Sequence, residues 1–204
     1  MATIRSRNRW VGGLTALAAA VLLVPGCNPV ENASQSATLL RIVSLTGKDL
    51  ANQDVNFLLS DVLYMSPETG AQSWIADTAK VTLSAELLDP KSISGSSMYN
   101  DVLLTRYVVT FQRADGKNSQ GVDVPYSFEG PMSVLVPIGQ ATSASFIIVR
   151  EVAKQEPPLL NLKNGLAGDG LYVTAKVDFY GHDGANKVVK ATGYLSITFA
   201  NYGN

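Results

Sequence analysis

The sequence has one cysteine, one histidine and no excess of positive charge, and each of these excludes a class of protein. One cysteine among 204 residues cannot form an internal disulfide or a cysteine-based zinc site. One histidine, His182, excludes a multi-histidine metal centre built by a single chain. A formal net charge of -1 gives no electrostatic reason to bind DNA or RNA, so we expect no nucleic-acid partner.

Charged residues are also scarce, at 16% of the chain, whereas hydrophobic residues make up 46%. Disordered chains have the opposite balance, with low hydrophobicity and high charge. The composition therefore predicts a chain that folds around a hydrophobic core.

The first 26 residues have the composition of a secretory signal peptide. They contain Arg5, Arg7 and Arg9 but no acidic residue, and residues 10–24 are uncharged and mostly apolar. An apolar run of about 15 residues is shorter than the roughly 20 that a transmembrane helix needs. We therefore predict a signal peptide over residues 1–26, with a buried amino-terminal helix as the alternative.

The apolar run ends in Val24-Pro25-Gly26-Cys27, which resembles the lipobox of bacterial lipoproteins. The resemblance implies that signal peptidase II cuts between Gly26 and Cys27. It also implies that Cys27 carries a diacylglyceryl thioether and an acyl chain such as palmitate on its amino group. Several chains on one residue would hold the protein at a membrane, whereas a single chain binds only reversibly. By the same resemblance, Asn28 in place of an aspartate favours the outer membrane over the inner membrane.

Removal of residues 1–26 would leave 13 basic and 17 acidic residues, a formal charge of -4. A mildly acidic chain has little attraction to anionic lipid, so we assign membrane attachment to the lipid on Cys27. Residues 28–36 are small and polar with no period, which predicts a flexible tether with a reach of roughly 15–20 Å. The expected organisation is a lipidated cysteine and tether over residues 27–36 and a single domain over residues 37–204.

From residue 37 onward the hydrophobic pattern has a period of two, which is typical of strands with one buried face. The clearest run is residues 173–179, and turn sequences such as Asp115-Gly116 and Asp183-Gly184 separate the runs. We predict an all-β fold, an antiparallel β-sandwich of about seven to nine strands with immunoglobulin-like or fibronectin-like architecture. A jelly roll, or two small sandwiches joined at residues 155–158, is the alternative. The predicted strands cover residues 39–45, 55–64, 81–87, 106–112, 143–149, 172–180 and 188–199.

The candidate polar sites are few. His182 could form a Ser-His-Asp site with Asp178 or Asp183, but no G-x-S-x-G or similar motif accompanies it, and we expect an exposed turn histidine. Asp178, Asp183 and Asn186 are calcium candidates because they place oxygen ligands around one predicted hairpin. Their spacing matches no calcium motif, and turns use Asp and Asn for their own hydrogen bonds. We therefore predict no catalytic residue, no metal ion and no cofactor.

Two further residue sets define the alternatives. The closest acidic pairs along the chain, Glu86 with Asp89 and Glu151 with Glu156, would suit a carboxylate-dependent hydrolase if folding created a cleft between them. Aromatic residues in or beside predicted loops would suit a sugar-stacking platform. These are Trp74, Tyr64, Tyr99 and Tyr126.

Taken together, these features favour a lipid-anchored protein of the bacterial cell envelope that is not an enzyme. We expect it to bind a protein or polysaccharide partner in adhesion or assembly. The alternatives are an envelope-associated carboxylate-dependent hydrolase and a carbohydrate-binding module.

Overall fold

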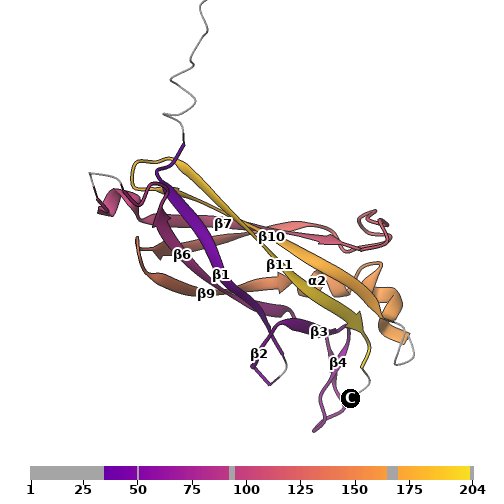
Figure 1. The fold of residues 1–204 in the computed structure, drawn as a ribbon. Helices are drawn as coiled ribbons and strands as arrows, with labels where there is room; N and C mark the ends of the chain where they lie inside the picture. Colours follow the sequence, from indigo (N-terminus) through magenta and orange to yellow (C-terminus); the bar gives the residue numbers. More distant parts are fainter. Residues whose placement is uncertain (1–34, 50, 92–94, 165–169, 203–204) are drawn as a thin grey trace, which may run out of the picture. The chain divides into compact units, whose positions relative to one another are not determined.

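The computed structural model describes residues 35–49, 51–91, 95–164 and 170–202 (Figure 1). These residues belong to one compact unit that begins at Gln35. The predicted signal peptide, Cys27 and most of the predicted tether lie outside the described residues. Within the described ranges, no helix is both long and apolar enough to cross a membrane.

Two sheets pack against each other and confirm the predicted all-β sandwich. The first sheet has the order β2 (Asp54–Val55), β1 (Thr38–Lys48), β6 (Asp77–Leu87), β9 (Ala141–Val149). The second has the order β3 (Phe57–Asp61), β11 (Val188–Ala200), β10 (Leu171–Asp183), β7 (Val102–Gln112), β8 (Phe128–Val136). A separate ribbon pairs β4 (Tyr64–Met65) with β5 (Gln72–Ser73), and the short helices are η1 (Met98–Asn100), α2 (Glu151–Lys154) and η2 (Leu159–Asn164).

The named strands of the described part pair antiparallel, with one exception: β3 runs parallel to β11. Strand β3 follows β2 of the first sheet after a single residue, Asn56, yet belongs to the second sheet. This crossing brings the carboxyl end of β3 close to the first sheet. There Ser60 of β3 bonds to Asp77, at the start of β6.

The core lies between the two sheets and is built by the period-two pattern. On β10, Val173, Ala175, Val177 and Phe179 are buried, as the alternation predicts. Phe146 of β9 meets the ring of Phe179 edge-on, with centroids 5.3 Å apart. Such edge-to-face contacts add to the free energy of burial and join the two sheets.

The described strands depart from the predicted ones in several places: the predicted strand over residues 55–64 is divided into β2, β3 and β4, and β6 and β7 begin four residues early. Strand β8 was not expected, because Gly130 and Pro131 interrupt its pattern. Strand β10 continues to Asp183, so the prediction that His182 lies in an exposed turn is wrong. His182 is half-buried and stays in register with Leu103 of β7 and Val188 of β11, since both neighbouring strands extend that far.

The described chain begins at one end of the sandwich, and the β4–β5 ribbon lies at the other end (Figure 1). The chain enters at one end, where Ser36 donates a hydrogen bond of 2.6 Å to Asp183. Strand β1 then runs to Lys48 at the other end, where β3 finishes and the β4–β5 ribbon begins. At about 3.3 Å per residue, β1 separates the two ends by roughly 35 Å.

Candidate functional site

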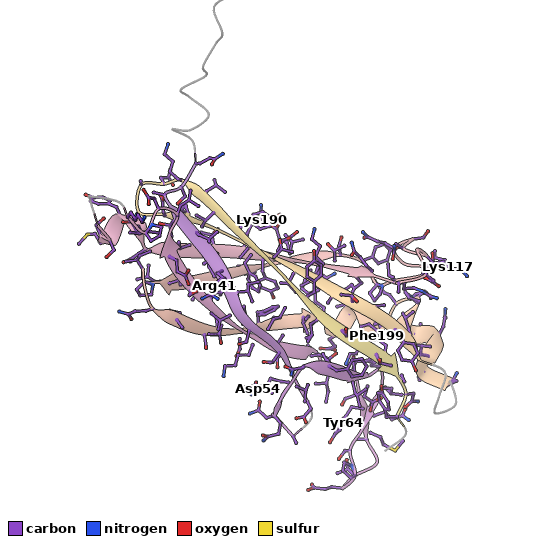
Figure 2. The ribbon with its side chains drawn as sticks, viewed as in Figure 1. Arg41, Asp54, Tyr64, Lys117, Lys190 and Phe199 are labelled. Atoms are coloured by element: carbon purple, nitrogen blue, oxygen red, sulfur yellow. The ribbon has the colours of Figure 1, made fainter. Side chains whose placement is uncertain are left out.

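A cavity of about 330 Å³ opens at the end of the sandwich far from Ser36. Figure 2 shows Tyr64, one of its lining residues, near this end. The cavity has an apolar side and a charged side. Leu59, Tyr64 and Ile75 line the apolar side, and the charged lining residues are Lys48, Asp49, Asp61, Asp77 and Lys154.

Lys154 is the best buried of these charged residues, with only 1% of its surface exposed. Its Nζ donates to the backbone carbonyl of Asp61 at 2.8 Å and to Oδ1 of Asp77 at 3.0 Å. The other oxygen of Asp77, Oδ2, accepts a hydrogen bond of 2.5 Å from Ser60. Lys154 therefore joins three segments distant in sequence: the end of β3, the start of β6 and helix α2.

Burial raises the pKa of the Asp77 carboxyl, because the charged form loses its hydration. The charge and hydrogen bond of Lys154 and the hydroxyl of Ser60 act in the opposite direction. The pKa of Asp77 remains above its ordinary value, so desolvation is the dominant effect. Among the described residues, Lys154 is the one cation that forms an ion pair with this carboxylate.

Asp61 is bonded much less completely than Asp77. The residue is 6% exposed, its Oδ1 accepts one long hydrogen bond of 3.4 Å from the backbone N–H of Tyr202, and its Oδ2 is buried with no partner. In the described part of the chain, only two other buried side-chain polar atoms have no partner, Trp74 Nε1 and Thr198 Oγ1. Trp74 precedes Ile75 of the cavity, and Thr198 is in register with Leu59. Unpartnered polar atoms are uncommon in folded proteins, and here they gather at one end.

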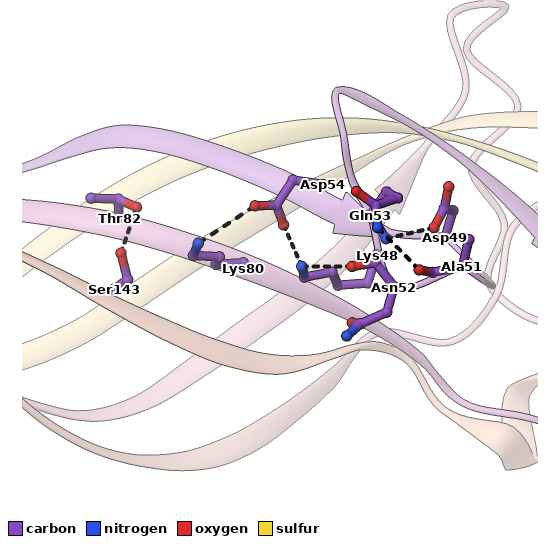
Figure 3. Close-up of polar contacts among 9 residues, drawn as sticks. All are labelled: Lys48, Asp49, Ala51, Asn52, Gln53, Asp54, Lys80, Thr82 and Ser143. Atoms are coloured by element: carbon purple, nitrogen blue, oxygen red, sulfur yellow. Dashed lines mark hydrogen bonds and ion pairs between the residues drawn. The ribbon is translucent and has the colours of Figure 1, made fainter.

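The rim of the cavity has its own ion pairs (Figure 3). Lys48 lies 2.8 Å from Asp54, and Lys80 lies 3.4 Å from the other oxygen of the same carboxylate. Hydrogen bonding by Lys48 lowers the pKa of Asp54. Asp49 accepts the backbone N–H of Gln53 at 2.7 Å and so stabilises the turn between β1 and β2. The charge of Lys48 is thus balanced outside the cavity.

The lipobox residues Gly26 and Cys27 lie outside the described residues. Of the calcium candidates, Asp178 sits on the outer face of β10, where Thr192 donates to it at 2.6 Å and Lys190 lies 3.2 Å away. Burial opposes ionisation of Asp178, but Thr192 and Lys190 outweigh burial and lower its pKa.

Asp183 is partnered differently, at the end of β10. Burial opposes its ionisation as well, but Ser36 and the backbone N–H groups of Lys187 and Ala185 lower its pKa. Asn186, the third calcium candidate, adopts a left-handed backbone in the same turn. Across the described residues, no three His, Cys, Asp or Glu side chains are grouped to hold a metal ion.

The predicted acidic pairs do not line the cavity. Glu86 bonds to Arg41 on an exposed surface, which lowers the pKa of Glu86, and Asp89 accepts the N–H of Lys91. Glu151 accepts a bond from Gln155 on the exposed side of α2. The acids that folding brings together are Asp61 and Asp77, which both line the cavity, and the charge of Asp61 contributes to the raised pKa of Asp77.

The aromatic candidates are dispersed. Trp74 is half-buried, with Nζ of Lys163 at 5.5 Å from its ring centroid, and Tyr64 lines the cavity. Tyr99 lies at the opposite end, where its carbonyl accepts the N–H of Gly184. The ring–ring contacts of the described part involve only core residues, which are Tyr107, Phe111, Phe128, Phe146, Phe179 and Phe199.

Sequence reasoning missed the central residue of the site, Lys154. It precedes Gln155–Pro158, a segment that resembles a linker, and its helix α2 has only four residues. Asp61 gave one local signal, because it is the only acid within the otherwise largely apolar run of residues 55–64. An acid in such a run is a candidate for a buried, partnered carboxylate.

Comparison with known proteins found no matching family model, no matching curated protein and no matching solved structure. The fold and the site therefore define the class: an all-β sandwich protein with a charged cavity at the end far from its chain entry. The finer immunoglobulin-like or fibronectin-like architecture stays a prediction.

Proposed function

We propose that this chain is a lipid-anchored binding protein of the bacterial cell envelope that acts in adhesion or assembly and has no catalytic site of its own. One observation carries the binding part of the proposal. The cavity lies at the end of the sandwich opposite Ser36, to which the predicted tether leads. A chain held by its amino terminus would present that cavity away from the membrane.

The anchor rests on the sequence alone. Signal peptidase II would expose Cys27, whose acyl chains would enter the membrane, with Asn28 favouring the outer membrane. A tether over residues 27–36 and a sandwich roughly 35 Å long would then place the cavity tens of ångströms from the lipid surface. The partner would be a protein or polysaccharide of the envelope.

Replacement of the lipobox cysteine tests the anchor. Cys27→Ala removes the sulfur that would form the thioether, so we expect complete loss of incorporation of an alkyne-labelled palmitate and an unprocessed precursor. The measurement is click labelling, gel mobility and membrane fractionation of full-length protein expressed in a bacterium. Ser36→Ala, in the same tether, should label as the wild type does. A Cys27→Ala protein that is processed and labelled normally would contradict the proposal.

A carboxylate-dependent hydrolase is the second candidate, and one observation favours it. Asp61 and Asp77 line the same cavity, and the pKa of Asp77 is raised by burial, as general acids require. Both oxygens of Asp77, however, already accept hydrogen bonds, from Lys154 and Ser60. Asp77 is therefore better suited to hold the cavity together than to transfer a proton.

A hydrolase screen separates the two candidates. Purified full-length protein should show no turnover of glycoside, ester and peptide substrates above that of its Asp61→Asn variant. Turnover that Asp61→Asn reduces by about 100-fold or more, the typical contribution of a general acid or base, would support the hydrolase instead. Glu129→Gln, which changes an exposed acid outside the cavity, is the matched control.

A further inference from the structure

We propose that the cavity receives a lysine side chain of a protein partner, with its ammonium group bound to the Asp61 carboxylate. The inference rests on the proposed binding function and names the group that this site recognises. It follows from three features of the cavity: an unbalanced negative charge, an acceptor without a donor, and an apolar wall.

The unbalanced charge belongs to Asp61. Lys154 forms its ion pair with Asp77, and Lys48 forms its own with Asp54, so both cations of the cavity lining already have a carboxylate partner. No ion pair within 4.0 Å includes Asp61 among the described residues. With both carboxyls ionised, the side chains of Asp61, Asp77 and Lys154 carry a formal net charge of -1. A buried charge without a partner is costly, and a bound cation would remove that cost.

The Asp61 carboxylate also lacks a hydrogen-bond donor. Oδ2 of Asp61 has no hydrogen-bond partner, and Oδ1 has only the long contact with Tyr202. A charge-assisted N–H···O bond would be stronger than the contact now present. Rotation about the Cβ–Cγ bond can turn either oxygen toward the cavity that Asp61 lines. An ammonium group, with three donors and a positive charge, fits these requirements.

The apolar wall of the cavity favours an ammonium group that is attached to an apolar stem. Leu59 is 54% exposed and Ile75 is 39% exposed, although both line the cavity, and Tyr64 lies beside them. These side chains would be covered by methylene groups, and each buried methylene would contribute favourably. Lysine carries its charge on a flexible stem of four methylenes, so it can bury the stem and pair the head.

Other ligands fit less well. An anion would meet the net negative charge of Asp61, Asp77 and Lys154. A divalent metal ion needs several carboxylate, imidazole or thiolate ligands grouped around it, and no such group of three is present among the described residues.

Binding of short peptides to the full-length protein tests the proposal. The probes are acetyl-Gly-Lys-Gly-amide and its norleucine counterpart, which keeps the stem and lacks the ammonium. We expect the lysine peptide to bind at least about tenfold more tightly by ligand-observed NMR titration, because a charge-assisted bond is lost in the norleucine peptide. n-Pentylamine serves as a third probe. If it binds more tightly than the lysine peptide, the site recognises a small free amine, and the proposal of a lysine from a protein partner is overturned.

Two variants localise the binding. Asp61→Asn keeps the shape of the side chain and removes its charge, so it should abolish the preference for lysine over norleucine. Ile75→Arg places a cation at the partly exposed mouth and should do the same without altering a buried residue. Glu129→Gln, which removes an exposed acid that pairs with Arg106 and does not line the cavity, should leave the preference unchanged within about twofold.

Equal binding of the two peptides, no binding of either, or a lysine preference that survives both Asp61→Asn and Ile75→Arg would overturn the proposal. Circular dichroism of each variant establishes that the fold is retained. The labelling of Cys27 is measured independently, so failure of the lysine site and failure of the envelope anchor are distinguishable.

Discussion

Lys154→Met is expected to lower the free energy of unfolding by about 3–5 kcal/mol at neutral pH. Methionine retains most of the buried stem but removes the ammonium that bonds to Asp77 and to the carbonyl of Asp61. The Asp77 carboxylate would then be buried with only Ser60 as a donor. Urea denaturation monitored by circular dichroism measures the loss.

The loss should depend on pH with a defined sign. The pKa of Asp77 in the folded protein is above its ordinary value of 3.8, so the folded state holds this proton more tightly than the unfolded state. Stability from Asp77 is therefore greatest below about pH 4 and falls as pH rises through the raised pKa. Lys154 limits the increase in the pKa of Asp77, so its removal should make stability fall more steeply with increasing pH. We expect Lys154→Met to be far less destabilising near pH 3 than near pH 7.

Lys80→Met is the matched control. Lys80 also faces a carboxylate, Asp54 at 3.4 Å, but the two side chains are 37% and 40% exposed, far more than that of Lys154. Exposed ion pairs contribute little, so the loss should be several-fold smaller than that of Lys154→Met and nearly independent of pH. Equal losses in the two variants would show that the Lys154–Asp77 pair does not stabilise the fold.

The strands that the sequence predicted best are those with one apolar and one polar face. On β10, Val173 and Val177 point inward while Thr174 and Lys176 remain partly exposed. A clean alternation allows only one register that buries the apolar set. For such strands the fold class follows from the residue order alone.

The pattern failed where both faces are apolar. On β1, Leu40 is buried but Leu39 is 47% exposed, and β3 buries Leu58 while Leu59 faces outward. Periodicity cannot choose between two apolar faces, because the choice depends on which neighbour each strand meets. That choice matters here, since the outward Leu59 forms part of the cavity wall.

Strand β8 failed for another reason. A proline lacks the N–H that a central strand needs, so Pro131 is unusual within a strand. The structure places β8 at the edge of its sheet, where proline is tolerated. Its neighbour Gly130 lies against the ring of Tyr107, where a Cβ would collide with the ring. The edge position of β8 and its contact with Tyr107 therefore explain why Gly130 and Pro131 occur within this strand.

The cavity was the least predictable feature. Ser60 and Asp77 are 17 residues apart, whereas Lys154 is 77 residues from Asp77. These residues meet because β3 crosses to the second sheet beside β11 and because Lys154 of α2 bonds to the backbone carbonyl of Asp61 at the end of β3. A local motif cannot encode contacts between residues so far apart in sequence, and the acidic pairs that are close in sequence do not line this cavity.

Val177→Asp should have the largest effect of any substitution considered, because it places an unpaired carboxylate in the centre of the core. Val177 is fully buried on β10, between Val109 of β7 and Gly193 of β11. The expected loss exceeds about 4 kcal/mol, close to the whole stability of many domains, so most of the protein should be unfolded at 37 °C. Thr174→Asp, three residues earlier on the outer face, should leave the thermal unfolding midpoint within a few degrees of wild type. Similar melting curves for the two variants would contradict the inward orientation of Val177, and with it the face of β10 on which the core is built.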